Sequence, residues 1–255
     1  MSTKFVRVLD TRRPIWGIVE GNVVYHLEGS PYGKWQRGAM LGALHALPLL
    51  PPTEPTKIIC VGRNYAAHAA EHNSPVPEAP LLFLKPPSSV VGPDAAIVLP
   101  TLSQRIEHEA ELAVVIARPC RDVTPEEAWD YVLGVTCGND VTARDLQRQD
   151  GQWTRGKGFD TFCPLGPWIV AGLTAADIAD LAVTCRVNGD LRQQGRTSEM
   201  VFSPAYIVSY AAAVMTLMPG DVLLTGTPAG VGPLTAGDVV DVEVEGIGVL
   251  RNPVR

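Results

Sequence analysis

An acidic segment opens the most apolar strand expected in this chain. Glu109 and Glu111 stand just before the run Leu-Ala-Val-Val-Ile at 112–116. This apolar run predicts a strand buried on both faces. Side chains alternate along a strand, so the two carboxylates point to the same side. Buried like charges at this separation raise each other's pKa unless a proton or a cation lies between them. The segment therefore predicts an acidic site at the mouth of a core strand.

Asp140 is the third acidic candidate, because it follows a second apolar run at 132–138. Three carboxylates without Cys or His form an oxygen-only site that suits Mg²⁺ or Mn²⁺, whereas Zn²⁺ prefers nitrogen or sulfur. A solvated strand face is the commoner explanation for an isolated Glu-x-Glu pair. The flanking apolar sequence favours the metal. We expect Glu109, Glu111 and Asp140 to be its ligands, and at least one of them to have a raised pKa without it.

Composition bounds the kind of protein. The chain has 255 residues, 46% of them apolar, and a net charge of −6, and its 21 Lys and Arg residues are scattered. This pattern argues against nucleic-acid binding. Five cysteines without Cys-x-x-Cys spacing predict neither disulfides nor a zinc knuckle. With no apolar run long enough for a bilayer or a signal peptide, we expect a soluble, cytoplasmic protein without membrane contact.

Three short strands, at 5–9, 15–20 and 23–27, predict a small N-terminal β domain over residues 1–50. A proline-rich stretch follows, and we expect a linker at 51–56. The main domain is then expected over residues 57–255.

The alanine-rich segment 66–72 predicts a helix that Asn64 could cap. His68 and Glu71 are three residues apart and so share one helix face, where the carboxylate can orient the imidazole as a general base. The alternative is a surface ion pair. His72 is four residues from His68, a spacing compatible with a metal, but we expect His72 to face solvent.

Further candidates lie downstream. Arg144 and Gln147 share one face of a predicted helical turn. Lys157 stands between two glycines and is either a mobile loop charge or a group that binds an anion or enolate. The glycine-rich segment 223–232 lacks the Gly-Lys-Ser/Thr of a nucleotide loop. It can instead offer backbone N–H groups and the Thr227 hydroxyl to a carboxylate.

Other elements are architectural. Thr124 predicts a helix that begins with a capping box and ends near residue 134. Asn188-Gly189 predicts a hairpin turn after a strand at 183–187, and Ser203 caps a predicted helix. The expected apolar stripe of that last helix consists of Ile207, Tyr210, Ala211, Val214 and Met218.

Five ordered motifs resemble the fumarylacetoacetate hydrolase superfamily across roughly residues 57–254: Val-Gly-Arg-Asn-Tyr at 61–65, Phe-Leu-Lys-Pro at 83–86, Glu-Ala-Glu-Leu at 109–112, Asn-Asp-Val-Thr-Ala-Arg-Asp at 139–145 and Gly-Thr-Pro-Ala-Gly-Val-Gly at 226–232. The resemblance implies an α+β, mainly β fold, a mixed β-roll with peripheral helices, and usually a homodimer. It also implies Mg²⁺ or Mn²⁺ on the three carboxylates. Substrate contacts are implied for Arg144, Gln147, Lys157 and Thr227, with His68 and Glu71 as a water-activating dyad on a mobile lid.

The implied function is hydrolysis of a C–C bond in small 2-oxo acids of the 2,4-dioxo type, such as acylpyruvates or fumarylpyruvate. His68 would take a proton from water, and Lys157 and the metal would stabilise the pyruvate enolate. The alternatives are an oxaloacetate decarboxylase and an isomerase of 2-hydroxy-diene-dioates, which use the same site. A non-enzymatic metabolite-binding module would need the carboxylates and Thr227, but not His68 or Glu71.

Overall fold

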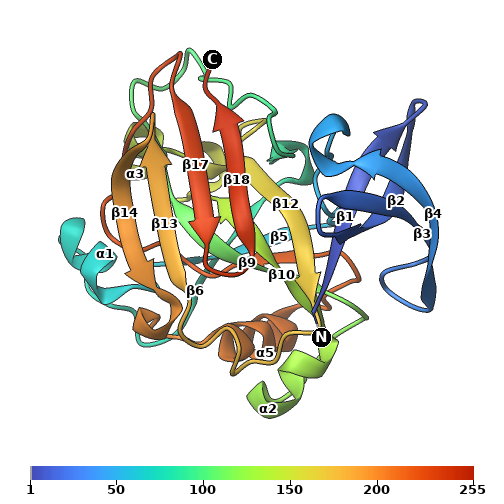
Figure 1. The fold of residues 1–255 in the computed structure, drawn as a ribbon. Helices are drawn as coiled ribbons and strands as arrows, with labels where there is room; N and C mark the ends of the chain where they lie inside the picture. Colours follow the sequence, from blue (N-terminus) through green and yellow to red (C-terminus); the bar gives the residue numbers. More distant parts are fainter. Residues whose placement is uncertain (1) are drawn as a thin grey trace.

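One large curved sheet organises the chain in the computed structural model, which describes residues 2–255 (Figure 1). Its strand order is β4-β3-β2-β1-β12-β10-β9-β15-β5-β6, and β7 pairs with β12. The strands are β1 (Thr3–Asp10), β2 (Arg13–Glu20), β3 (Val23–Gly29), β4 (Trp35–Ala43), β5 (Ile58–Gly62), β6 (Leu81–Lys85), β7 (Val90–Val91), β9 (Ala110–Ile116), β10 (Val132–Asn139), β12 (Cys163–Ala171) and β15 (Val222–Leu224).

Two smaller sheets complete the β structure. One has the order β11 (Thr142–Ala143), β8 (Ile106–His108), β16 (Gly232–Pro233), and the other has the order β14 (Asp190–Arg196), β13 (Ala182–Val187), β17 (Val239–Val244), β18 (Gly248–Pro253). The helices are short and peripheral: α1 (Ala66–Glu71), α2 (Pro125–Ala128), α3 (Arg144–Asp150), α4 (Thr154–Lys157) and α5 (Pro204–Val214). This architecture confirms the predicted mainly β fold class.

Strand β9 is the centre of the core, and all seven of its residues are buried. Leu112 and Val114 pack on one face with residues of the four-stranded sheet, such as Val242. Ala113 and Val115 alternate with them and pack on the opposite face. Such a strand must be apolar throughout because neither face meets water, which confirms the interpretation of its sequence.

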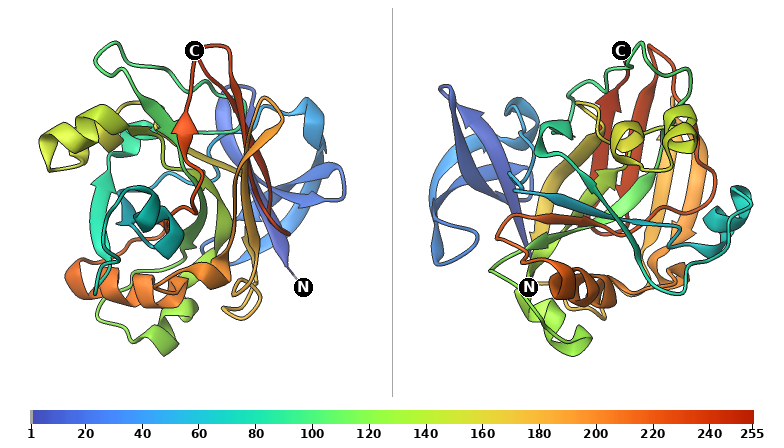
Figure 2. Two further views of the ribbon diagram at one scale, coloured as in Figure 1. Left: turned by 90° about the vertical axis from the view of Figure 1, so that its left-hand side faces the viewer. Right: turned by 180° about the vertical axis from the view of Figure 1, so that it is seen from behind.

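The N-terminal strands extend the main sheet. Strand β1 pairs antiparallel with β12, with Thr3 opposite Ala171, and β2, β3 and β4 follow outward. Figures 1 and 2 show these strands, in blue, on one side of the molecule. The segment 51–56 is packed against the main body, because Thr53 is fully buried and its hydroxyl donates to the Gly220 carbonyl at 2.8 Å. An independent N-terminal domain stays a prediction.

The capping box at Thr124 and the Ser203 cap are confirmed, but three other predictions about the helices were wrong. After the predicted Thr124 capping box, α2 ends at Ala128 and a 3-10 turn leads to β10 at Val132. The predicted α5 stripe fails at its end, since Val214 is 58% exposed. Asn64 does not cap α1; its amide group instead bonds to the Phe202 and Thr225 carbonyls, because tertiary partners compete with the local cap.

Two further features of residues 2–255 concern membrane-spanning helices and disulfide bonds. Their helices are all too short or too polar to cross a bilayer. The five cysteines are free and buried. The expected cytoplasmic location and homodimer stay predictions.

We predict that Asp221→Ala lowers the free energy of unfolding by about 3–5 kcal/mol, the range for breaking a buried ion pair. Asp221 is fully buried, forms an ion pair with Lys57 and accepts hydrogen bonds from the backbone N–H groups of Thr56, Lys57 and Met218. Urea unfolding followed by fluorescence measures the loss. The exposed Asp190→Ala is the matched control, and equal midpoints for the two variants would contradict the prediction.

Candidate active site

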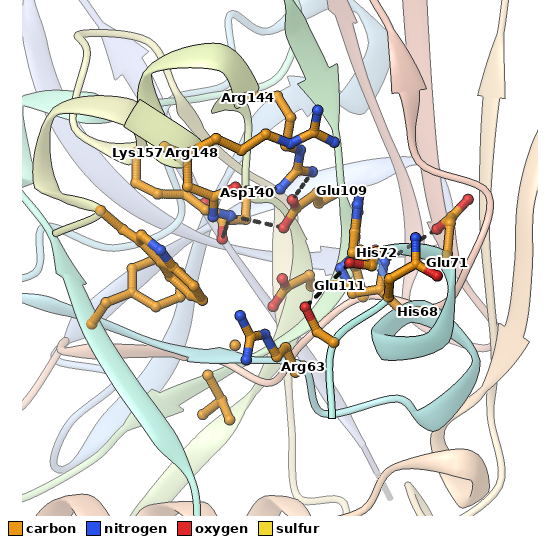
Figure 3. Close-up of a pocket in the computed structure, with 18 of the residues that line it drawn as sticks. Arg63, His68, Glu71, His72, Glu109, Glu111, Asp140, Arg144, Arg148 and Lys157 are labelled. Atoms are coloured by element: carbon orange, nitrogen blue, oxygen red, sulfur yellow. Dashed lines mark hydrogen bonds and ion pairs between the residues drawn. The ribbon is translucent and has the colours of Figure 1, made fainter. Parts of the chain in front are cut away.

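A cavity of about 600 Å³ opens at the start of β9 and is lined by residues of α1, α3, α4 and the turn after β15 (Figure 3). Glu109, Glu111 and Asp140 lie in it, each almost completely buried. One carboxylate oxygen of each lies within 4.8 Å of the others. The convergence of the three carboxylates predicted from the strand pattern is thereby confirmed.

Two buried ammonium groups contact these carboxylates. Lys157 Nζ donates to Glu109 Oε2 at 2.8 Å and to Asp140 Oδ2 at 2.6 Å. Lys85 Nζ donates to Asp140 Oδ1 at 2.5 Å. Of the two alternatives for Lys157, the mobile loop charge is excluded: the residue ends α4 and is 2% exposed, because the flanking glycines let the chain pack closely and the carboxylates compensate the buried charge. Its role toward an anion or enolate stays a prediction.

Arg144, at the start of α3, anchors the same cluster from the other side. Its guanidinium forms ion pairs with Glu107 and Glu109, and Nη1 donates to Gln147 Oε1 at 2.7 Å. The predicted shared face of Arg144 and Gln147 is confirmed. Glu107 was missed in the sequence, although it continues the alternation of Glu109 and Glu111 and could have been found from it.

The cluster contains one carboxylate more than it has buried cations. Its members are Glu107, Glu109, Glu111, Asp140, Lys85, Arg144 and Lys157. Burial would raise the pKa of Glu109, but Lys157 and Arg144 hold that pKa well below its ordinary value. For Glu111, burial and then the charges of Asp140 and Glu109 raise the pKa well above its ordinary value. The predicted raised pKa within the triad is confirmed.

A divalent cation fits this donor set. Glu111 is the carboxylate without a buried cationic partner, and it accepts a hydrogen bond from Gly226 N at 2.6 Å. A hard cation beside the three carboxylates would compensate the charge that a proton otherwise neutralises. The oxygen-only set suits Mg²⁺ or Mn²⁺.

His68 and Glu71 lie on helix α1, on the pocket wall (Figure 3). The His68 Nδ1 to Glu71 Oε2 distance is 3.3 Å, so the predicted pairing is confirmed. Glu71 also accepts from Gly230 N, at 3.2 Å to Oε1. Burial lowers the pKa of His68 below its ordinary 6.5, which leaves a neutral imidazole at pH 7. The expectation that His72 faces solvent is wrong, because its Nε2 atom is buried.

The turn after β15 supports Glu111 through its backbone. Gly226 has φ +98°, and a Cβ there would lie 2.7 Å from Asn64 Cβ, so only glycine fits. The Thr227 hydroxyl donates to the Ala110 carbonyl at 2.8 Å and accepts from Gln193 Nε2 at 2.7 Å. The donor of Thr227 is therefore used within the protein, and its role in substrate binding stays a prediction.

Two arginines that the sequence interpretation missed complete the pocket lining. Arg63 and Arg148 line the cavity, but neither takes part in the buried ion-pair cluster. The Arg63 guanidinium carbon lies 6.0 Å from the centre of the Trp153 ring, which packs edge-on against Phe83. Arg63 belongs to the Val-Gly-Arg-Asn-Tyr motif, whereas nothing in the local sequence distinguishes Arg148 from a surface arginine.

Two family models match this chain. Residues 57–255 match the family described as fumarylacetoacetate (FAA) hydrolase C-terminal, and residues 3–52 match the one described as Rv2993c-like, N-terminal. Oxaloacetate tautomerase FAHD2A, mitochondrial, of Homo sapiens is 45% identical over 233 residues, which cover 86% of this chain and 74% of that protein.

Two solved structures superpose over nearly the whole chain. The 2-hydroxyhepta-2,4-diene-1,7-dioate isomerase of Mycobacterium marinum has a TM-score of 0.91 and 43% identity, covering 99% of this chain and 98% of that one. The 5-carboxymethyl-2-hydroxymuconate delta-isomerase of Mycobacterium smegmatis has a TM-score of 0.89 and 45% identity, covering 98% of each chain. With its carboxylate cluster at the mouth of β9, this chain belongs to the fumarylacetoacetate hydrolase family.

Proposed function

We propose that this chain is a metal-dependent enzyme that moves a proton at the carbon next to the oxo group of small 2-oxo dicarboxylic acids, as a tautomerase or isomerase does. The observation that carries the proposal is a pocket with a base on one wall, a carboxylate cluster at its floor and two arginines outside that cluster. Its similarity to an oxaloacetate tautomerase of Homo sapiens and to two mycobacterial isomerases supports the proposal.

Glu109, Glu111 and Asp140 would hold Mg²⁺ or Mn²⁺. When bound, such an ion supplies Lewis-acid polarisation of a 2-oxo group. The residues around it have their own tasks. Lys157 and Lys85 compensate the negative charge of the floor, and Arg144 fixes Glu109 through its ion pair.

His68 is the proposed base. Its neutral imidazole can take a proton from the carbon next to the oxo group, and Glu71 accepts from Nδ1–H and so keeps Nε2 free as the acceptor. Negative charge then develops on the oxo oxygen, and the ammonium group of Lys157 is the proposed donor that stabilises it. Returning the proton to a different atom completes a tautomerisation or isomerisation without loss of any group.

Arg63 and Arg148 are the proposed partners of the distal carboxylate. Guanidinium groups bind carboxylates through paired N–H donors, and these two guanidinium groups are not used by the buried cluster. A neutral acyl group would leave them without an anionic partner. Their presence therefore favours dicarboxylic over monocarboxylic 2-oxo acids.

Hydrolysis of 2,4-dioxo acids is the second candidate, and the His68–Glu71 pair is the observation that favours it. In that reaction, His68 takes a proton from water, hydroxide adds to the distal carbonyl, and the C–C bond breaks to give a pyruvate enolate. Decarboxylation reaches the same enolate by loss of CO₂ and needs no activated water. A binding module, by contrast, would turn over none of these acids.

We predict that Glu111→Gln weakens Mn²⁺ binding by at least about 100-fold, since even loss of an outer-shell partner costs 10–100-fold. Without metal, its fold should persist, because glutamine resembles the protonated carboxyl group that the raised pKa implies. Because the pKa of Glu111 is raised in the folded state, this group stabilises the fold fully below about pH 4.5, and the stabilisation is lost as the pH rises through the raised pKa. In the metal-free Glu111→Gln variant, the free energy of unfolding should not show this decrease with rising pH.

Isothermal titration with Mn²⁺ and urea unfolding across pH measure the two effects of Glu111→Gln. Glu107→Gln is the matched control: it removes a carboxylate paired with Arg144 and Arg105, so it should destabilise the fold and affect Mn²⁺ binding less. Unchanged Mn²⁺ affinity in Glu111→Gln would contradict the ligand assignment.

We predict that His68→Ala reduces kcat/KM for keto–enol conversion of oxaloacetate by about 10²–10⁴-fold, the usual contribution of a general base. In the unmodified protein, the acid limb of the pH profile should lie below pH 6.5, because protonation abolishes the base and burial lowers its pKa. That limb should vanish in His68→Ala. Mn²⁺ affinity should hardly change.

Enol absorbance follows the conversion catalysed by His68→Ala and by a control, the exposed His45→Ala. Parallel assays of acetylpyruvate hydrolysis and oxaloacetate decarboxylation separate the candidates, because decarboxylation needs no activated water. Full keto–enol activity in His68→Ala would exclude His68 as the base, and faster hydrolysis than tautomerisation in the unmodified protein would favour the second candidate.

We predict that Arg63→Gln and Arg148→Gln each raise KM for oxaloacetate by about 10–100-fold, since a charge-assisted hydrogen bond contributes about 1.5–3 kcal/mol. Acetylpyruvate, which lacks the distal carboxylate, should be affected far less. Arg155→Gln is the matched control, because Arg155 is exposed and paired with Asp150. Equal losses for both substrates would show that the arginines do not select dicarboxylates.

A further inference from the structure

A second cluster of metal-ligating side chains lies on the pocket wall, apart from the carboxylate triad. His68, Glu71 and His72 each offer one ligand atom, and these atoms all lie within 4.8 Å of one another. The sequence His-Ala-Ala-Glu-His places the two imidazoles four residues apart: His68 lies on α1, and His72 is the C-cap residue that follows its last residue, Glu71. That spacing is the one by which a helix presents two histidines to one Zn²⁺ ion.

The state of His72 is the independent observation that points to a ligand. Its Nε2 atom is buried and has no hydrogen-bond partner among residues 2–255. Its ring meets the His68 ring edge-on, with 4.8 Å between the ring centres and an interplanar angle of 86°. A buried ring nitrogen without a partner costs free energy unless it binds something. A cation shared with His68 would satisfy it.

The donor set determines which cation fits. Two imidazoles and one carboxylate match borderline ions such as Zn²⁺ and differ from the oxygen-only triad, which suits Mg²⁺ or Mn²⁺. Ligand atoms of a tetrahedral Zn²⁺ site with bonds of about 2.0–2.1 Å are about 3.3–3.5 Å apart. The three ligand atoms lie within 4.8 Å of one another, and the distance from His68 Nδ1 to Glu71 Oε2 is 3.3 Å. A fourth position would be left for water.

We propose that His68, Glu71 and His72 form a second metal site, selective for Zn²⁺ over Mg²⁺, whose occupation switches the enzyme off. Inhibition rests on the proposed function: Zn²⁺ on His68 Nε2 would occupy the basic nitrogen, and Zn²⁺ on Nδ1 would leave the proton of the neutral imidazole on Nε2, so in either case Nε2 could not accept a proton. Binding itself does not rest on it. Zn²⁺ would also draw Glu71 away from Gly230 N, a contact that joins α1 to the turn after β15.

The test uses Co²⁺ as a spectroscopic substitute for Zn²⁺, on the full chain without a polyhistidine tag and in millimolar Mg²⁺ to occupy the triad. We expect one bound Co²⁺ with the strong visible absorption of a four- or five-coordinate, histidine-containing site, displaced by Zn²⁺. His72→Ala should weaken this binding by at least about 10–100-fold. The exposed His45→Ala and the triad variant Glu111→Gln should retain it.

Two outcomes would overturn the second site: no Co²⁺ bound with this spectrum, or equal Co²⁺ affinity in His72→Ala and the unmodified protein. In the activity arm, micromolar Zn²⁺ should inhibit the Mg²⁺-activated protein, and His72→Ala should need at least about ten-fold more Zn²⁺ for the same fractional inhibition. Binding of Co²⁺ and Zn²⁺ without inhibition would support the second metal site, but it would overturn its inhibitory role and contradict the proposed role of His68 as the base.

Discussion

The excess of buried carboxylates over buried cations in one cluster is the constraint on which this structure depends; Arg105, which also pairs with Glu107, is half exposed. Each buried charge costs several kcal/mol unless it is compensated, and Lys85, Arg144 and Lys157 compensate all but one of the acidic groups. Glu111 is the remainder, and its raised pKa records the imbalance. A protein selected for stability alone would gain by an apolar residue there. A cation bound beside the triad would compensate this acid in place of a proton.

Strand direction explains how distant parts of the chain meet at this cluster. Strands β9 and β10 run antiparallel, with Ala110 opposite Asn139, so the beginning of one lies beside the end of the other. Strand β15 is antiparallel to β9 and parallel to β5. The ends of β5 and β15 therefore lie near the beginning of β9. Helix α1 follows β5 and the Gly226 turn follows β15, which brings His68 and the backbone partner of Glu111 to the same pocket.

The sequence predicted those parts of the site that depend on local periodicity. The spacing of Glu109 and Glu111 and that of His68 and Glu71 are local properties, and each pair converges in the pocket, although Glu109 lies between β8 and β9 and not within one continuous strand. Burial of Lys157 could not be predicted locally, because it depends on Glu109, which is 48 residues away. Asn64 shows the same limit, since its side chain binds Thr225, 161 residues away, in place of capping its own helix.

The close approach of Gly226 and Asn64 ties two distant parts of the chain to one geometry. A Cβ at position 226 would lie 2.7 Å from Asn64 Cβ, and the Gly226 N–H group is the donor that holds Glu111. The side chain at position 64 therefore limits what position 226 can carry, and position 226 sets the orientation of an acid at the pocket floor. Because every residue except glycine carries a Cβ, a substitution at position 64 that keeps a Cβ would leave this limit in place, and position 226 is confined to glycine by a residue 162 positions away as well as by its own φ of +98°.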